Sequence, residues 1–549
     1  MSSEIELKFR IPAARLGAVR RAVATRSAVL EPLAAVYFDT PGEHLARARV
    51  ALRLRLEASG WVQTLKAEGA TAMQRLEHNV LLPDAGPQRP ALDLARHDGS
   101  PAGAVLARVL ADARADARKE ARTKAPAEAL AEAPAEAPTP LGGGASPSAS
   151  AAALTERYAT EVQRTRRLLR HGGALIELAL DEGHISAGAA GNVDAAVCSV
   201  CEIEFELLRG PPQALLDLAG RWVDRFGLVL DLRSKSERGH RLAQGHQASP
   251  PGHARPLKLS RQASSAQALA AMLANALGQV LANASQMADG HSQPEHLHQL
   301  RVGLRRLRSV LHVFAPVAAP ADASLAPRLS ALFTQLGAAR DQDAMAEWLW
   351  PALQAAGAPE FVRRAGLPAG LPADLTAALT TDLTTLLRAP ATQRLWLALL
   401  GACQPLEGAV PDPTAAPLPS LRQQLRKPLR RLYRQVQRDA ARFDALDDAA
   451  RHRLRRRIKR LRYATELSAA LWPAKAVAQL LRGLARAQAP LGEFNDTVVA
   501  QAHCQALAAH DARAWFAVGW LSARRQALAP VCALALARLA KRPGCWPRG

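Results

Sequence analysis

Two kinds of periodicity divide this sequence and limit what it can fold into. In the first 240 residues, short runs such as EIELKFR (4–10), LRLRL (52–56) and CEIEFEL (201–207) alternate polar and apolar residues. Alternation with a period of two is typical of β-strands whose two faces lie in different surroundings. From about residue 266 onward, Ala, Leu and Arg follow a 3.6-residue period, which predicts amphipathic helices. We therefore expect an antiparallel β domain followed by an all-α domain.

Changes in composition mark the expected domain boundaries. Residues 1–243 form the expected β domain, which is interrupted at about 111–153 by an insertion rich in Ala, Pro, Glu, Gly and Ser. Low-complexity sequence of this kind favours a flexible segment, and strand-like runs resume after it, so the insertion lies inside the β domain. The stretch 244–265 is the expected linker, and residues 266–549 form the expected helical domain.

The charge of the chain predicts an anionic partner. The formal net charge is +22, which favours nucleic acid, a phosphate polymer or an acidic membrane surface. Aromatic residues make up only 4% of the sequence, which counts against single-stranded nucleic acid, because its binding depends on stacking rings. We find no signal peptide, no run of 18 uncharged apolar residues and no disulfide framework among the six cysteines. We therefore expect no membrane span and a location in the reducing cytoplasm.

Charged residues recur at a spacing of two within the alternating runs. Glu4, Glu6 and Lys8 share one face of the first strand, and an isolated pattern of this kind is typical of a strand that faces water. Here, however, basic and acidic sets fall on separate strands: Arg53 with Arg55, Arg164 with Arg166, Glu177 with Asp181, and Glu202 with Glu204 and Glu206. Closing the sheet into a barrel would direct these side chains into one lumen. Carboxylates there suit Mg²⁺ or Mn²⁺, and basic side chains suit phosphate oxygens.

The motifs of the β domain resemble those of the CYTH family, the triphosphate tunnel metalloenzymes. EIELKF, LRLR, TLKAEG, RLEHNV, LALDEG, CEIEFEL and SKSERG occur in the family's order over roughly residues 1–240. The resemblance implies an eight-stranded antiparallel tunnel that hydrolyses inorganic triphosphate, thiamine triphosphate or related nucleotides. The low-complexity insertion departs from the family's compact domain, although it falls between strands.

The resemblance also implies roles for individual residues. The expected ligands of a Mg²⁺ or Mn²⁺ ion are Glu4, Glu6, Asp181, Glu202 and Glu204. The expected substrate-binding residues are Lys8, Arg53, Arg55, Lys66, Arg75, Arg164, Arg166, Lys235 and Arg238. In the implied mechanism, water attacks a terminal phosphoryl group while basic residues neutralise the developing charge. The residues expected to act in catalysis are Glu6, as a hypothetical proton acceptor, together with Lys8, Arg53 and Arg55.

The helical half contains an internal repeat of one basic pattern. HQLRVGLRRLRSVL begins at His298, and HRLRRRIKRLRYAT begins at His452, 154 positions later. In each copy, basic residues at steps of three, four and three lie on one side of a helix, beside an apolar stripe. On a single helix such a face is commonly just solvated. Two copies with the same spacing favour a shared groove for a long polyanion.

Together with LGAARDQD (336–343) and LGEFND (491–496), this repeat resembles the CHAD domain over roughly residues 265–549. The resemblance implies two pseudo-symmetric helical bundles that bind inorganic polyphosphate. The expected polyphosphate-binding residues are His298, Arg301, Arg305, Arg306 and Arg308 in the first copy, and His452, Arg455, Lys459, Arg460 and Arg462 in the second. The residues expected to orient these arginines are Arg340, Asp341, Asp343, Asn495 and Asp496.

We therefore expect a multi-domain α+β protein with an N-terminal eight-stranded antiparallel β tunnel and a C-terminal duplicated helical bundle. The expected function is metal-dependent hydrolysis of inorganic triphosphate to diphosphate and phosphate, with polyphosphate bound by the helical domain and association with polyphosphate granules. Membrane and nucleic acid are not expected partners. Two alternatives stay open: a class IV-type adenylate cyclase or thiamine triphosphatase on the same fold, and a polyphosphate-granule binding protein without enzymatic activity.

Overall fold

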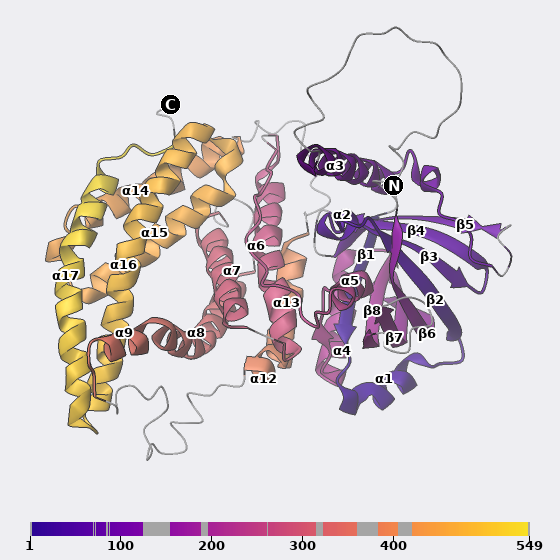
Figure 1. Cartoon of the computed structure of the whole chain (residues 1–549), viewed down its shortest axis with the longest axis horizontal. Helices are drawn as coiled ribbons and strands as arrows, with labels where there is room; N and C mark the ends of the chain where they lie inside the picture. Colours follow the sequence, from indigo (N-terminus) through magenta and orange to yellow (C-terminus); the bar gives the residue numbers. More distant parts are fainter. Residues whose placement is uncertain are drawn as a thin grey trace, which may run out of the picture. The chain divides into compact units, whose positions relative to one another are not determined.

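The computed structural model of the chain divides into two compact units, Met1–Ser249 and Pro250–Gly549 (Figure 1). It describes residues 3–69, 71, 73–83, 86, 88–124, 154–187, 196–260, 262–291, 293–314, 322–359, 383–404 and 420–546. At 121–124 and 338–346 it describes the backbone alone.

The N-terminal unit is a closed antiparallel β-barrel of eight strands. The strands are β1 (Ser3–Arg10), β2 (Val29–Asp39), β3 (Ala51–Glu57), β4 (Gly60–Glu68), β5 (Gln74–Leu82), β6 (Thr155–His171), β7 (Ala174–Ala187) and β8 (Ala196–Arg209). Their order is β5-β4-β3-β2-β6-β7-β8-β1, and the pairing of β1 with β5 closes the barrel. The short β9 (Val229–Leu230) adds to β1. The expected tunnel is thereby confirmed.

In the described part of the N-terminal unit, five α-helices accompany the barrel. They are α1 (Leu16–Val23), α2 (His44–Arg47), α3 (Pro101–Lys124), α4 (Pro212–Phe226) and α5 (Lys235–Ala243). The packing of one of them, α4, shows which strand faces point inward. Phe9 of β1, Phe205 of β8 and Trp222 of α4 form a chain of edge-to-face rings with centroids 5.5 Å apart. Since this apolar side of β1 and β8 packs under α4, the alternate, charged side of both strands faces the lumen.

Two of these helices bear on the sequence-based expectations. Residues 111–124, assigned above to the insertion, form the second half of α3; residues 125–153 lie outside the described part of the chain. The SKSERG motif begins α5, whose Ser234 caps the helix by accepting a hydrogen bond from the Glu237 amide. α5 packs on β6, where the Tyr158 hydroxyl lies 2.8 Å from Ser236 Oγ. The short helix therefore presents its first residues to the strands.

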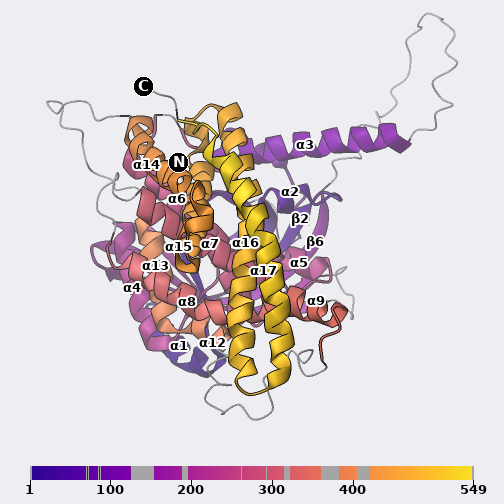
Figure 2. The ribbon, with the colours of Figure 1, turned by 90° about the vertical axis from the view of Figure 1, so that its left-hand side faces the viewer.

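The C-terminal unit is all-α. Its helices are α6 (Ser265–Ala288), α7 (Pro294–Val313), α8 (Leu325–Ala344), α9 (Trp350–Ala355), α12 (Leu383–Arg388), α13 (Pro390–Ala402), α14 (Leu421–Ala440), α15 (Asp448–Leu467), α16 (Ala474–Ala508) and α17 (Trp515–Ala540). The long helices α16 and α17 run side by side (Figure 2). α7 and α15, which carry the two copies of the basic repeat, pack against each other. The expected helical domain is also confirmed.

Among the described helices, α6 alone is long and apolar enough to cross a membrane by composition. Of its most apolar window, 56% is buried inside the unit, and core helices of soluble proteins pass the same test. Residues before α6 also lie along it, since the Gly252 amide donates to Asn283 Oδ1 at 3.0 Å.

Gly239 allows α5 to approach β6 closely, and this generates a first prediction. A Cβ at Gly239 would lie 2.2 Å from Cδ2 of the buried Tyr158 ring. We expect Gly239→Ala to displace α5 and to lower the free energy of unfolding of the N-terminal unit by about 1–3 kcal/mol. Calorimetry of the full chain measures this. Gly278→Ala in α6, where a Cβ meets nothing within 4 Å, is the control; equal unfolding temperatures for the two variants would contradict the prediction.

Candidate functional site

Three carboxylates lie together in the barrel lumen, on β7 and β8. Asp181, Glu202 and Glu204 each place one oxygen within 4.8 Å of the others. Asp181 pairs directly with Glu202 across the two strands, and both residues are only 1% exposed. Three buried carboxylates at this separation would take up protons unless cations lie beside them. We call these residues the acidic triad.

Lys235, the first residue of α5, is the central counter-charge of the acidic triad. Its Nζ lies 2.6 Å from Asp181, 2.5 Å from Glu202 and 3.0 Å from Glu204. Arg164 of β6 binds Asp181 through two hydrogen bonds, of 2.7 and 2.6 Å. Burial by itself would raise the pKa of Asp181 and of Glu204, but Lys235 and Arg164 outweigh it and lower both pKa values. Asp181 and Glu204 are thus ionised, and the three carboxyl groups of the triad supply oxygen donors, which suit a hard divalent cation such as Mg²⁺ or Mn²⁺.

Glu4 and Glu6 lie in a neighbouring group on β1, β4 and β5. Lys66 Nζ is 2.9 Å from Glu4 and 2.7 Å from Glu77, and Arg75 is 3.7 Å from Glu6. Burial raises the pKa of Glu4 to about 9, and a hydrogen bond with Glu77 adds to the rise. The same hydrogen bond helps to lower the pKa of Glu77, so this pair holds one proton. Among the described residues, the structure brings three of the five expected metal ligands into one cluster and places the other two here.

Lys8 lies on the same strand as Glu4 and Glu6 and contacts the acidic triad. It is 7% exposed, its Nζ lies 3.9 Å from Glu204, and it donates to the Arg233 carbonyl at 3.3 Å. Arg233 is itself fixed by hydrogen bonds of 2.9 and 2.7 Å to the buried Asp231. Lys8 is therefore held at one end by a rigid backbone segment, with its charge directed to the lumen.

Three carboxylates of the lumen are absent from the expected site residues: Glu77, Glu177 and Glu206. The sequence pattern placed Glu177 and Glu206 on inward strand faces but gave them no role. Glu206 pairs in register with Glu6 on one side and with Glu177 on the other. Burial raises the pKa of Glu206 to about 7; Lys66 opposes the rise, whereas Glu177, Glu77 and Glu6 add to it. The spacing of two that selected Glu202 and Glu204 also includes Glu206, so the signal was present in the sequence. These carboxylates, with Glu4 and Glu6, form a second set of oxygen donors that could hold a cation.

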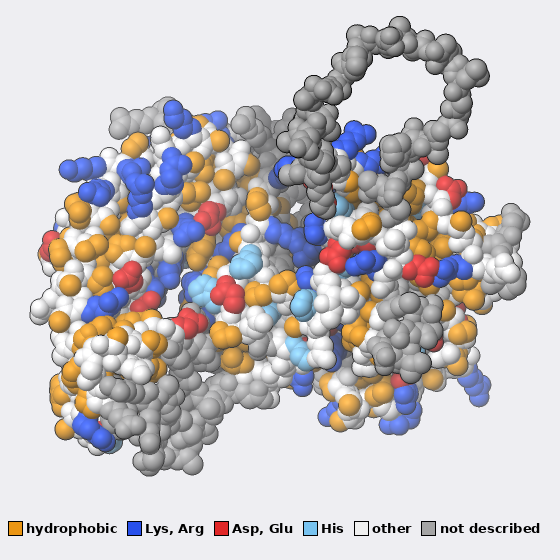
Figure 3. Space-filling view, in the orientation of Figure 1, with side chains coloured by type: hydrophobic (Ala, Val, Ile, Leu, Met, Phe, Trp, Pro, Cys, Tyr) orange, Lys and Arg blue, Asp and Glu red, His pale blue; other side chains and the backbone are white. Residues whose placement is uncertain are grey.

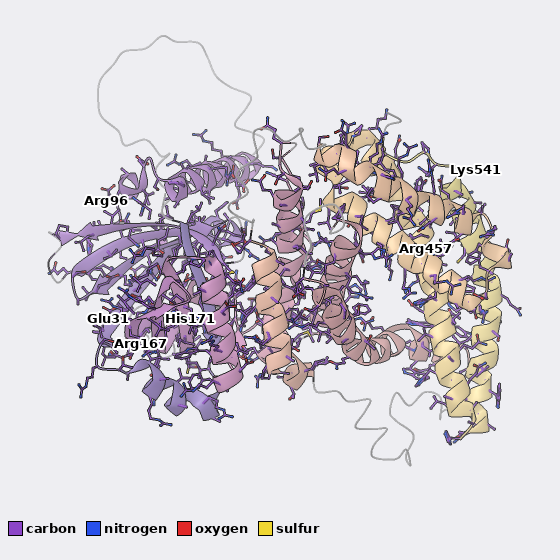
Figure 4. All side chains as sticks on the ribbon, turned by 180° about the vertical axis from the view of Figure 1, so that it is seen from behind. Glu31, Arg96, Arg167, His171, Arg457 and Lys541 are labelled. Atoms are coloured by element: carbon purple, nitrogen blue, oxygen red, sulfur yellow. The ribbon has the colours of Figure 1, made fainter. Side chains whose placement is uncertain are left out.

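The remaining predicted basic residues also line the lumen, but with other partners. Arg53 donates to the Tyr37 hydroxyl at 3.1 Å, and Arg55 donates to Glu57 at 2.6 Å. Arg166 lies 3.0 Å from Glu31 of β2, which Figure 4 labels on the barrel. Arg238, on α5, contacts Glu202 of the acidic triad. Each of these four arginines is an N–H donor whose present partner a phosphate oxygen could replace.

In the helical unit, the two copies of the basic repeat face each other. Arg301, Arg305 and Arg308 of α7 lie over the ring of Phe333 on α8, with guanidinium carbons 4.6, 5.9 and 5.1 Å from its centroid. The pKa of Arg308 is lowered by burial and by Arg456 of α15. Cations from both helices therefore share one region, which we call the α7–α15 face.

The second copy uses polar partners in place of the phenylalanine. His452 Nδ1 lies 2.7 Å from Asn495 Oδ1, so we assign the proton to Nδ1, and Arg455 donates to Asp496 at 3.1 Å. Arg462, the counterpart of Arg308, donates to Glu466 at 2.8 Å. Asn495 thus contacts the histidine of the repeat and Asp496 one of its arginines, while the orienting role expected of both stays a prediction. The side chains of Arg340, Asp341 and Asp343 lie outside the described ones.

Lys459 lies among the cations of the α7–α15 face. Burial lowers its pKa to about 7, and Arg455, Arg305 and Arg301 act in the same direction, while Asp496 opposes them. The low pKa of Lys459 therefore reflects its burial first and the neighbouring arginines second.

Three other predicted residues of the repeat have different surroundings. Arg306 is 3% exposed and donates to Gln279 and Asn275 of α6 at 3.0 and 2.7 Å, so it faces the core of the unit. Arg460 is partly buried, and both Arg456 and Arg308 lower its pKa after burial itself. His298 lies half-buried on α7, one turn before Arg301.

The fold and the site define a class of protein: a closed tunnel lined by both signs of charge, followed by a helical domain with a repeated basic face. Family models agree with this description, since a CYTH domain matches residues 2–228 and a CHAD domain matches residues 271–505. The CHAD domain from the plant Ricinus communis is 32% identical; the match covers 54% of this chain and 99% of that one, with a TM-score of 0.45.

Two solved structures match the N-terminal unit at lower identity. A putative adenylate cyclase from Bacillus halodurans is 14% identical over 43% of this chain and 98% of its own, with a TM-score of 0.26. A putative adenylyl cyclase from Hippeastrum, described as having a dominant triphosphatase activity, is 16% identical over 44% of this chain and 96% of its own, with a TM-score of 0.27. The chain belongs to the CHAD family through its helical unit, and its N-terminal unit is a CYTH domain. The CYTH family includes triphosphatases and cyclases.

The ion pairs of Lys235 predict a link between metal binding and stability. We expect Lys235→Ala to cost about 3–5 kcal/mol of unfolding free energy, because it leaves the buried acidic triad without its main counter-charge. Added Mg²⁺ or Mn²⁺ should restore part of this loss, so the metal-induced rise in Tm should be larger for Lys235→Ala than for the wild type. Scanning calorimetry with and without metal measures both effects. The exposed Arg21→Ala on α1 is the control, and equal metal-induced shifts in all three proteins would contradict the prediction.

Proposed function

We propose that the CYTH domain hydrolyses inorganic triphosphate to diphosphate and phosphate with the help of a divalent cation, and that the CHAD domain binds inorganic polyphosphate. One observation carries the first half of the proposal: inside a closed barrel, all three carboxyl groups of the acidic triad lie within hydrogen-bond distance of Lys235, and two of them also lie within that distance of Arg164. Carboxylates and fixed cations in one enclosed space match a substrate that combines several phosphate charges with a bound cation.

The basic residues of the lumen have the task of binding and orienting the substrate. Lys8, Arg164 and Lys235 lie next to the acidic triad and would bind phosphate oxygens close to it. Arg53 and Arg55 project from one face of β3 and would neutralise charge on the phosphoryl group during transfer. Glu6, on the same side of β1 as Lys8, is the hypothetical acceptor of a proton from the attacking water. Lys66, Arg75, Arg166 and Arg238 complete the binding surface.

The acidic triad and the group around Glu4, Glu6 and Glu206 are the residues that would hold the cation. A bound Mg²⁺ or Mn²⁺ supplies charge neutralisation on phosphate oxygens and lowers the pKa of coordinated water. Ion pairs with lysine and arginine hold these carboxylates in position, so their oxygen atoms would be arranged before a cation binds.

For the helical domain, support comes from the α7–α15 face. Phosphate polymers present closely spaced negative charges, and arginine contacts phosphate oxygens through several N–H groups at once. Such a ligand would offset the repulsion of Lys459 by Arg455, Arg305 and Arg301, which adds to the effect of burial on its pKa.

Replacement of Glu204 tests the hydrolytic half of the proposal. We expect Glu204→Ala to reduce metal-dependent phosphate release from triphosphate by at least about 100-fold, because it removes a candidate ligand and a partner of Lys235 and Arg164. Release of phosphate from triphosphate, ATP and thiamine triphosphate is measured in parallel. Preference for ATP with cyclic product, or for thiamine triphosphate, would replace the proposal by a cyclase or a thiamine triphosphatase.

The control for this experiment is Glu161→Ala, an exposed carboxylate on β6, which should keep wild-type rates. If the wild type releases no phosphate from any of the three substrates with Mg²⁺ or Mn²⁺ and still binds polyphosphate, the protein is a binding protein without this activity. Undiminished activity of Glu204→Ala would remove the acidic triad from the mechanism.

The pKa of Lys459 predicts how polyphosphate binding depends on pH. Because this pKa is lowered to about 7, the positive charge of Lys459 is lost as the pH rises from 6 to 8. A polyanion prefers the protonated form, so we expect affinity to fall about three- to tenfold across this range, roughly the effect of one charge contact. Calorimetric titration with long-chain polyphosphate at constant ionic strength measures the fall.

Lys459→Arg is the matched variant, since arginine keeps its charge throughout this range. Its affinity should be nearly independent of pH, apart from the ionisation of the polyphosphate ends, which the variant and the wild type share. Parallel pH profiles for the two proteins would show that Lys459 does not contact the ligand.

A further inference from the structure

A second line of basic side chains lies on α14, outside both copies of the repeat. Lys427, Arg431, Arg434 and Arg438 follow one another at steps of four, three and four, and all four side chains are exposed. They lie on the side of the helix opposite its buried apolar residues, which are Leu421, Leu425, Leu429, Leu432, Val436 and Ala440. At 1.5 Å per residue, the four cations extend over about 16 Å. We call them the α14 strip.

The α14 strip lacks the acidic residues that usually accompany exposed basic ones. The only carboxylate of α14 is Asp439, and Arg457 of α15 engages it. In the described part of the chain, no ion pair joins a member of the strip to a carboxylate. Like charges three or four residues apart destabilise a helix by about 0.2–0.5 kcal/mol per pair. On a helix face that contacts only water, nothing would compensate for this repulsion between like charges.

Further exposed cations surround the strip. The Tyr433 hydroxyl of α14 donates to the Leu539 carbonyl at 3.2 Å and to the Arg542 carbonyl at 2.9 Å, so the end of α17 lies beside α14. Arg538 and Lys541 are exposed at this end, and Figure 4 labels Lys541 on it. On the face that Figure 3 shows, Lys and Arg side chains also gather at the upper left of the picture, over the helical unit.

The strip also has a physical connection to the α7–α15 face. α14 packs on α15, and Arg457 of α15 contacts Asp439 of α14. Arg460, next in sequence to Lys459, lies near Arg456 and Arg457 as well as near Arg308 of α7, since all three affect its pKa. Cations thus follow one another from α7 across α15 toward α14.

The chemistry of the strip favours a phosphate polymer over nucleic acid. No aromatic ring is exposed on α14, because its one aromatic residue, Tyr433, is buried and hydrogen-bonded. Single-stranded nucleic acids bind through stacked bases, for which the strip offers no surface. A chain of phosphates needs only regularly placed cations.

We propose that the α14 strip is a second contact line for polyphosphate, engaged together with the α7–α15 face by chains long enough to reach both. This rests on the proposed binding of polyphosphate by the CHAD domain. A long chain bound at one line meets the other at a high effective concentration, so its affinity exceeds that of a short chain. Each cation that contacts the polymer also releases counterions, which makes affinity dependent on salt.

The test compares two double variants with equal loss of charge. Arg431→Gln with Arg434→Gln removes half of the α14 strip, whereas Arg21→Gln with Arg221→Gln removes two exposed charges from the CYTH domain. Binding is measured in EDTA, which prevents hydrolysis, with chains of about 100 and about 10 phosphates. For the long chain, we expect the strip variant to bind about 5- to 20-fold more weakly at low salt. Its slope of log affinity against log salt should be smaller by about 1–2.

Other results separate the possible failures. The strip variant should bind the short chain within about twofold of the wild type, and its unfolding temperature should be unchanged or higher, because like-charge repulsion is removed. If both double variants lose affinity equally, only net charge matters and the inference is overturned, while the proposed function stands. If the wild type binds no polyphosphate, both fail. If the strip variant loses affinity for duplex DNA but not for polyphosphate, the strip serves nucleic acid, and the inference is overturned.

Discussion

The ion pairs of Lys235 with three buried carboxylates are the interaction on which the N-terminal domain depends. Burial alone would raise the pKa of Asp181 and of Glu204 and so favour their protonated forms, which are poor ligands for a cation. The compensating charge comes from α5 through Lys235 and from β6 through Arg164. The close contact of Gly239 with the Tyr158 ring therefore has an electrostatic consequence, because it positions the helix that carries Lys235. Tyr158 lies on the same face of β6 as Arg164, so the packing of α5 on this strand and the charge balance in the lumen are one problem.

In the helical domain, the groups that need stabilising contacts are neighbouring cations, not carboxylates. The basic face is stabilised by an aromatic ring in the first copy, where three arginines lie over Phe333, and by amides and carboxylates in the second. A ring face attracts a guanidinium without neutralising it, whereas Asp496 neutralises part of the charge of Arg455. Among the described side chains, the two copies of one sequence pattern therefore hold their arginines by different contacts, and repulsion between the cations adds to burial in lowering the pKa of Lys459.

The sequence predicted the faces of strands and helices well, because periods of two and 3.6 residues determine which side chains share a face. It placed Glu4, Glu6 and Lys8 on the lumen side of β1 and separated the tunnel from the helical domain. It could not supply register, which depends on pairing between distant segments. Its spacing placed Glu206 on an inward face, but only the register shows that this residue lies opposite both Glu6 and Glu177. Nor could the helical period show that Arg306 donates hydrogen bonds to two amide side chains of α6, whereas Arg305, one residue earlier, lies over the ring of Phe333. Residues 111–124 were assigned to the low-complexity insertion, yet they form the second half of α3. This helix packs on β4 and β5.

The cations of the two domains differ in how many of them are paired with carboxylates, and this difference would determine how each domain interacts with a phosphate chain. In the tunnel, Lys66, Arg164 and Lys235 are each paired with carboxylates, so a ligand must replace existing ion pairs and gains affinity only if it satisfies both signs of charge at once. Such a site favours a small ligand together with a cation and discriminates against a bare polyanion. On the α7–α15 face, Asp496 and Glu466 engage Arg455 and Arg462, whereas no ion pair in the described part of the chain joins the α14 strip to a carboxylate. The polyphosphate chain proposed to bind there would gain affinity with each contact and lose it as salt rises. Lysine and arginine would therefore produce selectivity in the enclosed site and avidity on the open strip, and the difference would come from the carboxylates placed beside them.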